Sequence, residues 1–162
     1  CRNAQKFISL AMIDVDHFKG VNDLYGHPVG DRVLIYLSHA LKKIQTKNIR
    51  AFRMGGDEFS ILFKDCDPEE TYRICEALRI QMGSCPLRTA DEKRVTLSCG
   101  AVSIEPVNSD PEMLIKAADS ALYTAKNSGR DRVVVFDELV PSISPRPEQD
   151  GRGIGWESIG NR

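Results

Sequence analysis

The stretch that decides the fold of this chain is Arg53-Met54-Gly55-Gly56-Asp57-Glu58-Phe59-Ser60-Ile61-Leu62. It places two glycines and two acids between segments 50–53 and 59–63, which we predict to be paired strands. A pair of glycines allows the backbone to turn with φ > 0 and leaves space for a ligand. Two consecutive carboxylates at such a tip suit a hard metal cation and, through it, a phosphate. The same four residues are also typical of an ordinary solvated hairpin, so the turn alone leaves both interpretations open.

Length and composition indicate a single domain of a soluble globular protein. The 162 residues are enough to bury a core, and a hydrophobic fraction of 41% with 28% charged residues is ordinary for that class. No segment has the roughly 20 apolar residues that cross a membrane, and no signal peptide is visible. The chain begins with Cys1, so we expect a fragment of a longer protein, with sensory, dimerising or membrane-attached segments upstream.

Charge and cysteine content argue against several other classes of protein. A net charge of −1 provides no basic surface for nucleic acid. The five cysteines are odd in number and have no Cys-x-x-Cys spacing, so neither a zinc site nor a disulfide framework is expected. Such free thiols favour a reducing compartment, and we expect this domain to be cytoplasmic.

Apolar patterning and helix signals along the chain predict alternating strands and helices. Asp67 and Pro68, for example, are a helix cap and a first helical residue. The predicted elements are a strand at 7–13, a helix at 18–25 closed by Gly26, a helix at 32–43, the hairpin 50–53 and 59–63, a helix from 68 to about 82, a strand at 94–104, a helix from Asp110-Pro111 to Gly129, and a strand at 133–136. The expected fold class is therefore α+β, an α/β sandwich with a mixed, mainly antiparallel sheet flanked by helices.

Two further patterns predict packing and domain extent. Gly100 inside a strand indicates close approach of another backbone. The last predicted helix carries an apolar stripe of small residues at helical spacing, formed by Leu114, Ala117, Ala118, Ala121, Leu122 and Ala125. Beyond about residue 139 the pattern stops, so we expect a domain at 1–139 and a flexible Pro/Gly-rich tail at 140–162, which contains Trp156.

Besides the Gly-Gly-Asp-Glu turn, three polar clusters lie at the ends of predicted elements. Residues 14–19 follow a strand with acids and then open a helix, an arrangement that can hold a metal and a phosphate together. Asn22 and Asp31 offer an amide and a carboxylate, and a carboxylate accepts well from the N1–H and N2–H₂ groups of guanine. Lys126 and Arg130 are cations near a helix C-terminus.

Each cluster also has a structural interpretation. Lys126 and Arg130 alone are explained by the helix dipole, and Asn22 and Asp31 alone by a turn and a helix cap. His17 is better explained as a structural partner than as a metal ligand, since no second histidine lies at ligand spacing. The occurrence of all four clusters in one domain favours a common site.

These motifs resemble the GGDEF domain, the family of diguanylate cyclases that condense two GTP into cyclic di-GMP. The resemblance covers residues 7–136, most of the chain. It rests on D-x-D-x-F-K-x-x-N-D-x-x-G-H-x-x-G-D at 14–31, R-x-G-G-D-E-F at 53–59, V-T-L-S-C-G-A at 95–101 and A-D-x-A-L-Y-x-A-K-x-x-G-R at 118–130. It implies a palm-like fold related to class III nucleotide cyclases.

The resemblance also implies a role for individual residues. Asp14, Asp57 and Glu58 would be catalytic and, with the Val15 carbonyl, would bind Mg²⁺ or Mn²⁺; Glu58 is our candidate for the group that accepts the 3′-OH proton. The implied GTP-binding residues are the amides of His17, Phe18 and Lys19, the side chains of Lys19, Lys126 and Arg130 for the phosphates, Asn22 and Asp31 for guanine, and Gly56 for space at the turn.

Three expectations about activity follow from the resemblance. Each domain would bind one GTP, so catalysis would need a homodimer. The R-x-x-D motif through which many members bind inhibitory product is replaced by Thr46-Lys47-Asn48-Ile49, so we expect no such inhibitory site. The alternative functions are a catalytically silent domain that binds GTP and regulates a neighbour, and an interaction domain that binds no nucleotide.

Overall fold

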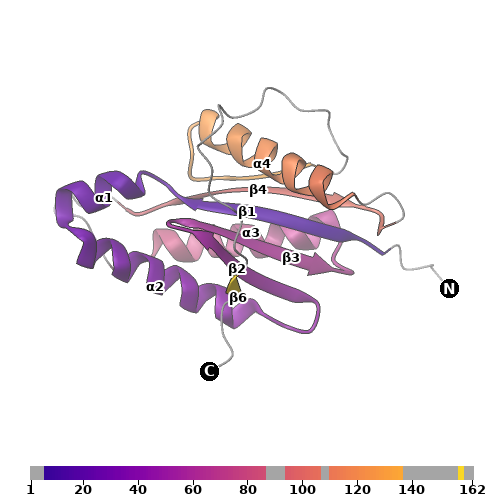
Figure 1. Ribbon diagram of the computed structural model, residues 1–162, viewed down its shortest axis with the longest axis horizontal. Coiled ribbons are helices and arrows are strands. Elements are labelled where there is room, and N and C mark those ends of the chain that lie inside the picture. The colour runs from indigo at the N-terminus through magenta and orange to yellow at the C-terminus, as the bar shows by residue number, and fades with distance from the viewer. Residues whose placement is uncertain (1–5, 87–93, 107–109, 137–156, 159–162) are drawn as a thin grey trace.

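The core of the computed structural model is a six-stranded sheet with the strand order β5-β4-β1-β3-β2-β6 (Figure 1). The structure describes residues 6–86, 94–106, 110–136 and 157–158. The strands are β1 (Ile8–Val15), β2 (Ile49–Gly55), β3 (Glu58–Lys64), β4 (Leu97–Ile104), β5 (Val133–Phe136) and β6 (Glu157–Ser158). Neighbouring strands are antiparallel except β4 and β5, which are parallel. The predicted mixed, mainly antiparallel sheet is therefore confirmed.

Helices cover both faces of this sheet, which confirms the α+β class. The described helices are α1 (Phe18–Tyr25), α2 (His27–Ile44), α3 (Pro68–Gly83) and α4 (Pro111–Asn127). In Figure 1, α4 lies on one face of the sheet, α2 and α3 lie on the other, and α1 extends from the end of β1 beside α2. No helix in the described ranges combines the length and the apolar character needed to cross a membrane.

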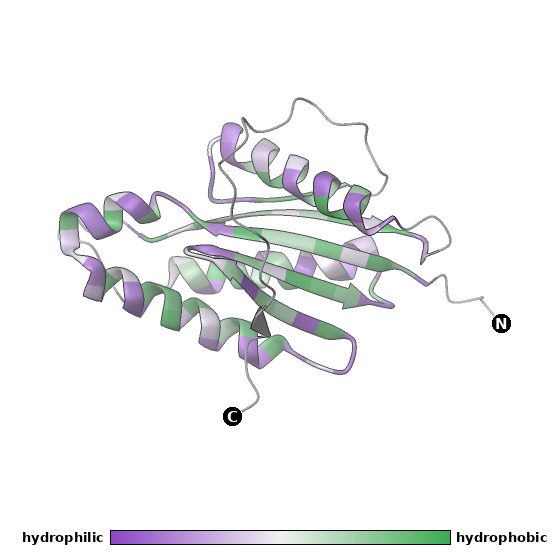
Figure 2. Cartoon of the chain, in the orientation of Figure 1, coloured by the Kyte–Doolittle hydropathy of each residue, from purple (hydrophilic) through white to green (hydrophobic). Residues whose placement is uncertain are grey.

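The alternation of side chains along β1 divides the core into two layers. Leu10 and Met12 pack with α4, whereas Ala11, Ile13 and Val15 pack with the layer that contains α2 and α3. Because successive strand residues point to opposite faces, a central strand covered on both sides is expected to be mainly apolar. Figure 2 shows this as a hydrophobic band along the central strands, with hydrophilic residues on the outer surfaces of the helices.

The predicted start of the second helix, at residue 32, is wrong. α2 begins at His27, directly after Gly26, which ends α1 with a φ of 84°. Pro28 lies in the first turn of α2, where its missing N–H costs nothing because the first amides of a helix have no partner within it. As a consequence Asp31 lies inside α2, so it is not the N-cap residue that the structural interpretation required.

The other element boundaries differ less from the prediction. The hairpin strands are longer than 50–53 and 59–63, and β4 begins at Leu97 instead of 94. The cap of α3 is as predicted, with Asp67 accepting a hydrogen bond from the Glu70 amide at 2.7 Å. Within the predicted tail, Glu157–Ser158 pairs with β2. The boundary at residue 139, Trp156 and the rest of the tail lie outside the described residues.

Gly100 fulfils the prediction of close backbone approach. A Cβ atom added at this position would overlap the backbone of Ala121 and Leu122. The predicted apolar stripe of α4 is buried along its full length. Small residues on both sides therefore let the axis of α4 lie closer to β4 than ordinary side chains would permit.

We predict that Gly100→Ala lowers the free energy of unfolding by about 3 kcal/mol, because the added methyl meets backbone atoms that cannot move aside alone. Urea unfolding followed by circular dichroism measures the change. Gly20→Ala is the matched control, since a Cβ there meets nothing within 4 Å and alanine favours a helix by about 0.5–1 kcal/mol. Equal stability of Gly100→Ala and the unsubstituted protein would contradict the contact.

Candidate active site

Two acids from different parts of the sequence face each other at one end of the sheet. Asp14 is near the end of β1 and is paired in register with Glu58, the first residue of β3. The Asp14 carboxylate is largely buried and its Oδ2 lies 2.7 Å from the Nζ atom of Lys126, in the last turn of α4. The sheet register and the position of α4 thus bring three predicted site residues together.

The pKa of the Asp14 carboxyl depends on the acids and the lysine around it. Burial raises the pKa of the Asp14 carboxyl above its ordinary value, and the charges of Asp57 and Glu58 raise this pKa further. The hydrogen bond and the positive charge of Lys126 act in the opposite direction, but the net change remains upward. Among the described residues, the charges that act on the Asp14 carboxyl are therefore those of two other acids and of one ammonium group.

The Gly-Gly-Asp-Glu turn is a two-residue hairpin turn between β2 and β3. Gly56 has a φ of 54°, and a Cβ added there would meet nothing within 4 Å, so the space above it is open. Arg53 donates from Nη2 at 2.8 Å and from Nε at 3.1 Å to the Gly56 carbonyl, and its guanidinium lies 5.9 Å from the ring centre of Phe59. The quoted motif contained Arg53, but only the structure reveals that it fixes the shape of the turn.

The start of α1 presents backbone amides shortly after the end of β1. His17 precedes the helix with a φ of 56° and makes no side-chain cap, so its imidazole does not satisfy the first amides. The first amides of a helix have no acceptor within it, and the helix dipole makes this end attractive to anions. Phe18 and Lys19 are the first two residues of α1, and Lys19 is exposed.

The Asn22 side chain packs against Gly30, the residue before Asp31 in α2. A Cβ added to Gly30 would overlap Oδ1 of Asn22 and lie 3.1 Å from the ring of Phe18, so only glycine leaves room for the Asn22 side chain. The Asn22 Oδ1 atom is buried and accepts no hydrogen bond within the described residues. An orphaned polar atom of this kind can be satisfied by a group on a bound molecule. Sequence reasoning assigned no role to Gly30.

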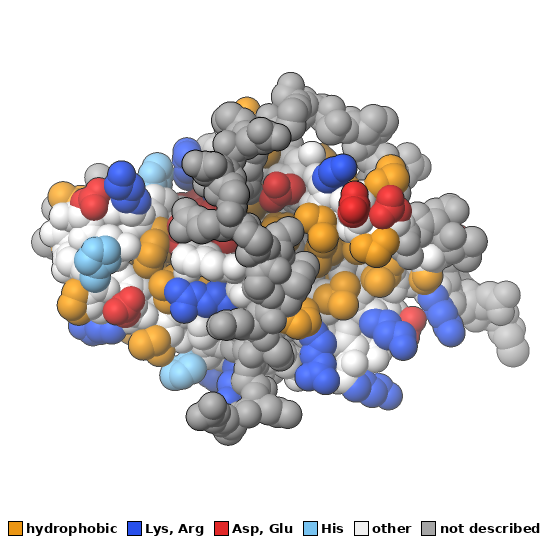
Figure 3. Space-filling view, viewed as in Figure 1, with side chains coloured by type: hydrophobic (Ala, Val, Ile, Leu, Met, Phe, Trp, Pro, Cys, Tyr) orange, Lys and Arg blue, Asp and Glu red, His pale blue; other side chains and the backbone are white. Residues whose placement is uncertain are grey.

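Lys126 and Arg130 differ in their surroundings. The ion pair to Asp14 shows that Lys126 is more than a surface charge that stabilises the end of a helix. Arg130 is exposed and lies after the end of α4, in a left-handed backbone conformation with a φ of 62°. On the face viewed in Figure 3, acidic side chains lie between α1 and α4, with Lys and Arg side chains around them.

The predicted metal ligands fit a magnesium ion in part. Within the described residues, no three His, Cys, Asp or Glu side chains form a ready metal-binding group. Mg²⁺ however uses one or two carboxylates together with substrate phosphates more often than a complete protein cage. The facing pair of Asp14 and Glu58 has that chemistry, and the ligand roles of Asp14, Val15, Asp57 and Glu58 all remain predictions.

Comparison with known proteins places this geometry in a family. The family model described as "Diguanylate cyclase, GGDEF domain" matches residues 1–132. DgcT of Escherichia coli (strain K12), a probable diguanylate cyclase, is 40% identical over 149 residues, which are 88% of this chain and 32% of that protein. The chain spans about a third of the length of the curated relatives that it matches first.

Solved structures agree with this assignment. The GGDEF domain of DgcB from Caulobacter crescentus, in complex with c-di-GMP, is 31% identical with a TM-score of 0.74, and the match covers 80% of this chain and 78% of that one. The active GGEEF domain of a Vibrio cholerae diguanylate cyclase is 29% identical with a TM-score of 0.73, over 82% and 84% of the two chains. These matches confirm the palm-like fold, and the chain belongs to the GGDEF domain family of diguanylate cyclases.

Proposed function

We propose that this domain is a diguanylate cyclase that condenses two GTP into cyclic di-GMP and releases two pyrophosphates, with Mg²⁺ or Mn²⁺ as cofactor. The observation that carries the proposal is the meeting of Asp14, Glu58 and Lys126 at one end of the sheet, next to the turn. The relationship to DgcT and to the c-di-GMP-bound domain of DgcB supports the same reaction.

The cationic groups of the site are proposed to hold the triphosphate. Lys126 pairs with Asp14, and its ammonium group would be free to bind a phosphate once Asp14 binds a cation. Lys19, Arg130 and the amides of His17, Phe18 and Lys19 supply the remaining donors. The metal ion would neutralise phosphate charge and lower the pKa of the attacking 3′-hydroxyl.

The transfer itself is proposed to begin with Glu58. Its carboxylate would accept the proton of the 3′-hydroxyl, whose oxygen forms a bond to the α-phosphorus of the second GTP as the bond to pyrophosphate breaks. The two carboxylates Asp14 and Asp57 would keep the cation and the phosphates in place. Because each domain holds one GTP, both transfers need two domains face to face, so we propose a homodimer assembled by segments outside this domain.

Asn22 and Asp31 are proposed to select guanine. The Asp31 carboxylate would accept from N1–H and N2–H₂, whereas the N1 atom of adenine is an acceptor and would leave the carboxylate unsatisfied. The orphaned oxygen of Asn22, held against Gly30, supports a second contact to the base. The substrate is therefore proposed to be GTP rather than ATP.

The first prediction is that the purified chain with Mg²⁺ and GTP forms cyclic di-GMP, detected by chromatography, and that the rate per domain rises with protein concentration. Glu58→Gln should reduce the rate by at least about 100-fold, the contribution of a general base. Glu69→Gln, a change of the same chemistry on exposed α3, should have no effect. GTP binding without product in a dimer would instead support the regulatory alternative, and no binding would support an interaction domain.

The second prediction concerns Gly30→Ala. Its methyl group displaces the Asn22 amide, so we expect GTP affinity in Mg²⁺ to fall about 10-fold, the loss of one hydrogen bond, as measured by calorimetry. Preference for GTP over ATP should decrease with it, as it should in Asp31→Ala. Gly83→Ala, at the last residue of α3, where a Cβ meets nothing within 4 Å, is the matched control. If ATP bound as tightly as GTP in every variant, guanine selection would be refuted.

The third prediction is that cyclic di-GMP at micromolar concentration does not inhibit noncompetitively. Thr46 and Ile49 stand where the R-x-x-D motif has its Arg and Asp. The Thr46 amide donates to the Ile49 carbonyl at 3.0 Å, and the Ile49 side chain is buried in the core. Neither residue can supply a charge to bound product. Addition of product to the same assay measures this, and a noncompetitive fall in rate would overturn the prediction.

A further inference from the structure

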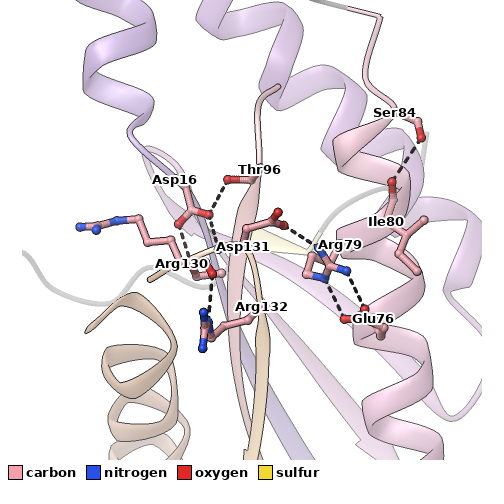
Figure 4. A network of polar contacts seen from close by, with 10 residues as sticks. Asp16, Glu76, Arg79, Ile80, Ser84, Thr96, Arg130, Asp131 and Arg132 are labelled. Carbon is pink, nitrogen blue, oxygen red and sulfur yellow. Dashed lines mark hydrogen bonds and ion pairs between the residues drawn. The ribbon is translucent and has the colours of Figure 1, made fainter. Parts of the chain in front are cut away.

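A buried acid beside the proposed site is used by none of the steps above. Asp16 is 4% exposed, and its carboxylate accepts hydrogen bonds from Ser98 Oγ to Oδ1 at 2.7 Å and from Thr96 Oγ1 to Oδ2 at 2.8 Å. Oδ2 also accepts from the backbone amide of Asp131 at 3.1 Å. The carboxylate therefore connects the end of β1 to the start of β4 and to the loop that follows α4 (Figure 4).

The loop joined to Asp16 has an unfavourable backbone conformation. Arg130 and Asp131 both have a positive φ, of 62° and 44°, and residues other than glycine rarely adopt such a backbone conformation. Such residues persist only where their surroundings hold them in place. The Asp131 amide is held by Asp16, and the Arg130 amide donates to the carbonyl of Ala125 at 3.1 Å.

A second anchor reaches the same loop from α3. The Asp131 carboxylate accepts from Nη1 of Arg79 at 2.7 Å. Arg79 is in turn oriented by Glu76, which lies one turn earlier in α3 and accepts from Nη2 at 2.7 Å and Nε at 2.9 Å. In Figure 4 the side chain of Arg130 points away from Arg79 and Arg132. Among the described residues its guanidinium has no ion-pair partner.

We propose that Asp16 is a positioning residue for Arg130. Together with Arg79 it holds the strained backbone of the loop. The guanidinium of Arg130 is then already positioned where the triphosphate would bind. The inference rests on the proposed function, because it assumes that Arg130 binds phosphate. A long side chain on a fixed backbone loses less conformational entropy when it binds, and affinity improves accordingly.

The test uses the full chain and a double-mutant cycle. The probe is the α,β-methylene analogue of GTP, which cannot release pyrophosphate, with Mg²⁺ in a calorimeter. We expect Asp16→Asn and Arg130→Ala each to weaken binding about 10-fold, and the double variant to be no more than about twofold weaker than Arg130→Ala alone, since residues that act through one contact are not additive. Arg79→Met, at a partly exposed position, repeats the cycle in case Asp16→Asn does not fold.

Two controls separate positioning from general stability. Ser98→Ala removes only the bond to Oδ1, so it should lower stability and leave affinity for the analogue unchanged. Hydrogen exchange in the absence of nucleotide should be faster at the Asp131 amide in Asp16→Asn but not in Ser98→Ala. This readout does not depend on GTP binding.

The other outcomes separate failure of the positioning role from failure of the proposed function. Additive effects of Asp16→Asn and Arg130→Ala, or an affinity loss no larger than that of Ser98→Ala, would overturn the positioning role while the proposed function stands. If the unsubstituted protein did not bind the analogue at all, the proposed function would fail, and the role of Asp16 in phosphate binding with it. Unchanged exchange of the Asp131 amide in Asp16→Asn would overturn the inference whatever the nucleotide results.

Discussion

The close contact between Gly100 and the backbone of α4 is the constraint on which the site depends. Because no side chain separates the helix from β4 at this point, α4 lies directly on the sheet and its last turn reaches the end of β1. Lys126 then lies beside Asp14. A wider separation would move Lys126 and the following loop with Arg130 away from the acids. The packing of α4 on β4 therefore determines which charges lie close together in the site.

The acidic cluster around Asp14 lowers the stability of the fold, and the nearby Lys126 reduces this loss. Burial and two neighbouring acids raise the pKa of the Asp14 carboxyl, and Lys126 offsets only a part of this. Like charges placed close together cost stability, and groups with perturbed pKa values are typical of functional sites. The same holds for Asn22, whose buried Oδ1 atom has no hydrogen-bond partner among the residues that the structure describes.

Two short connecting segments are restrained by residues of the rigid elements around them. The turn after β2 is fixed by Arg53, and the loop after α4 by Asp16 and Arg79. Each of these three residues lies on or next to a strand or helix of the core. This arrangement lets short loops carry the chemistry without losing their geometry, because the strands and helices supply the restraint that the loops lack.

The sequence by itself determined the fold class, the order of the elements, the stripe of α4 and the family, because periodicity and local motifs act over a few residues. It also identified Asp14, Glu58 and Lys126 as candidates. The start of α2 was predicted wrongly because Asp31 resembles a helix cap. The helix instead begins at His27, since Gly26 can adopt a positive φ and Pro28 is accepted in a first turn. Only the tertiary structure decided that Lys126 pairs with Asp14, that Gly30 makes room for Asn22, and that Asp16 accepts the amide of Asp131. Those contacts join residues through register and packing, and no local pattern encodes the distances between them.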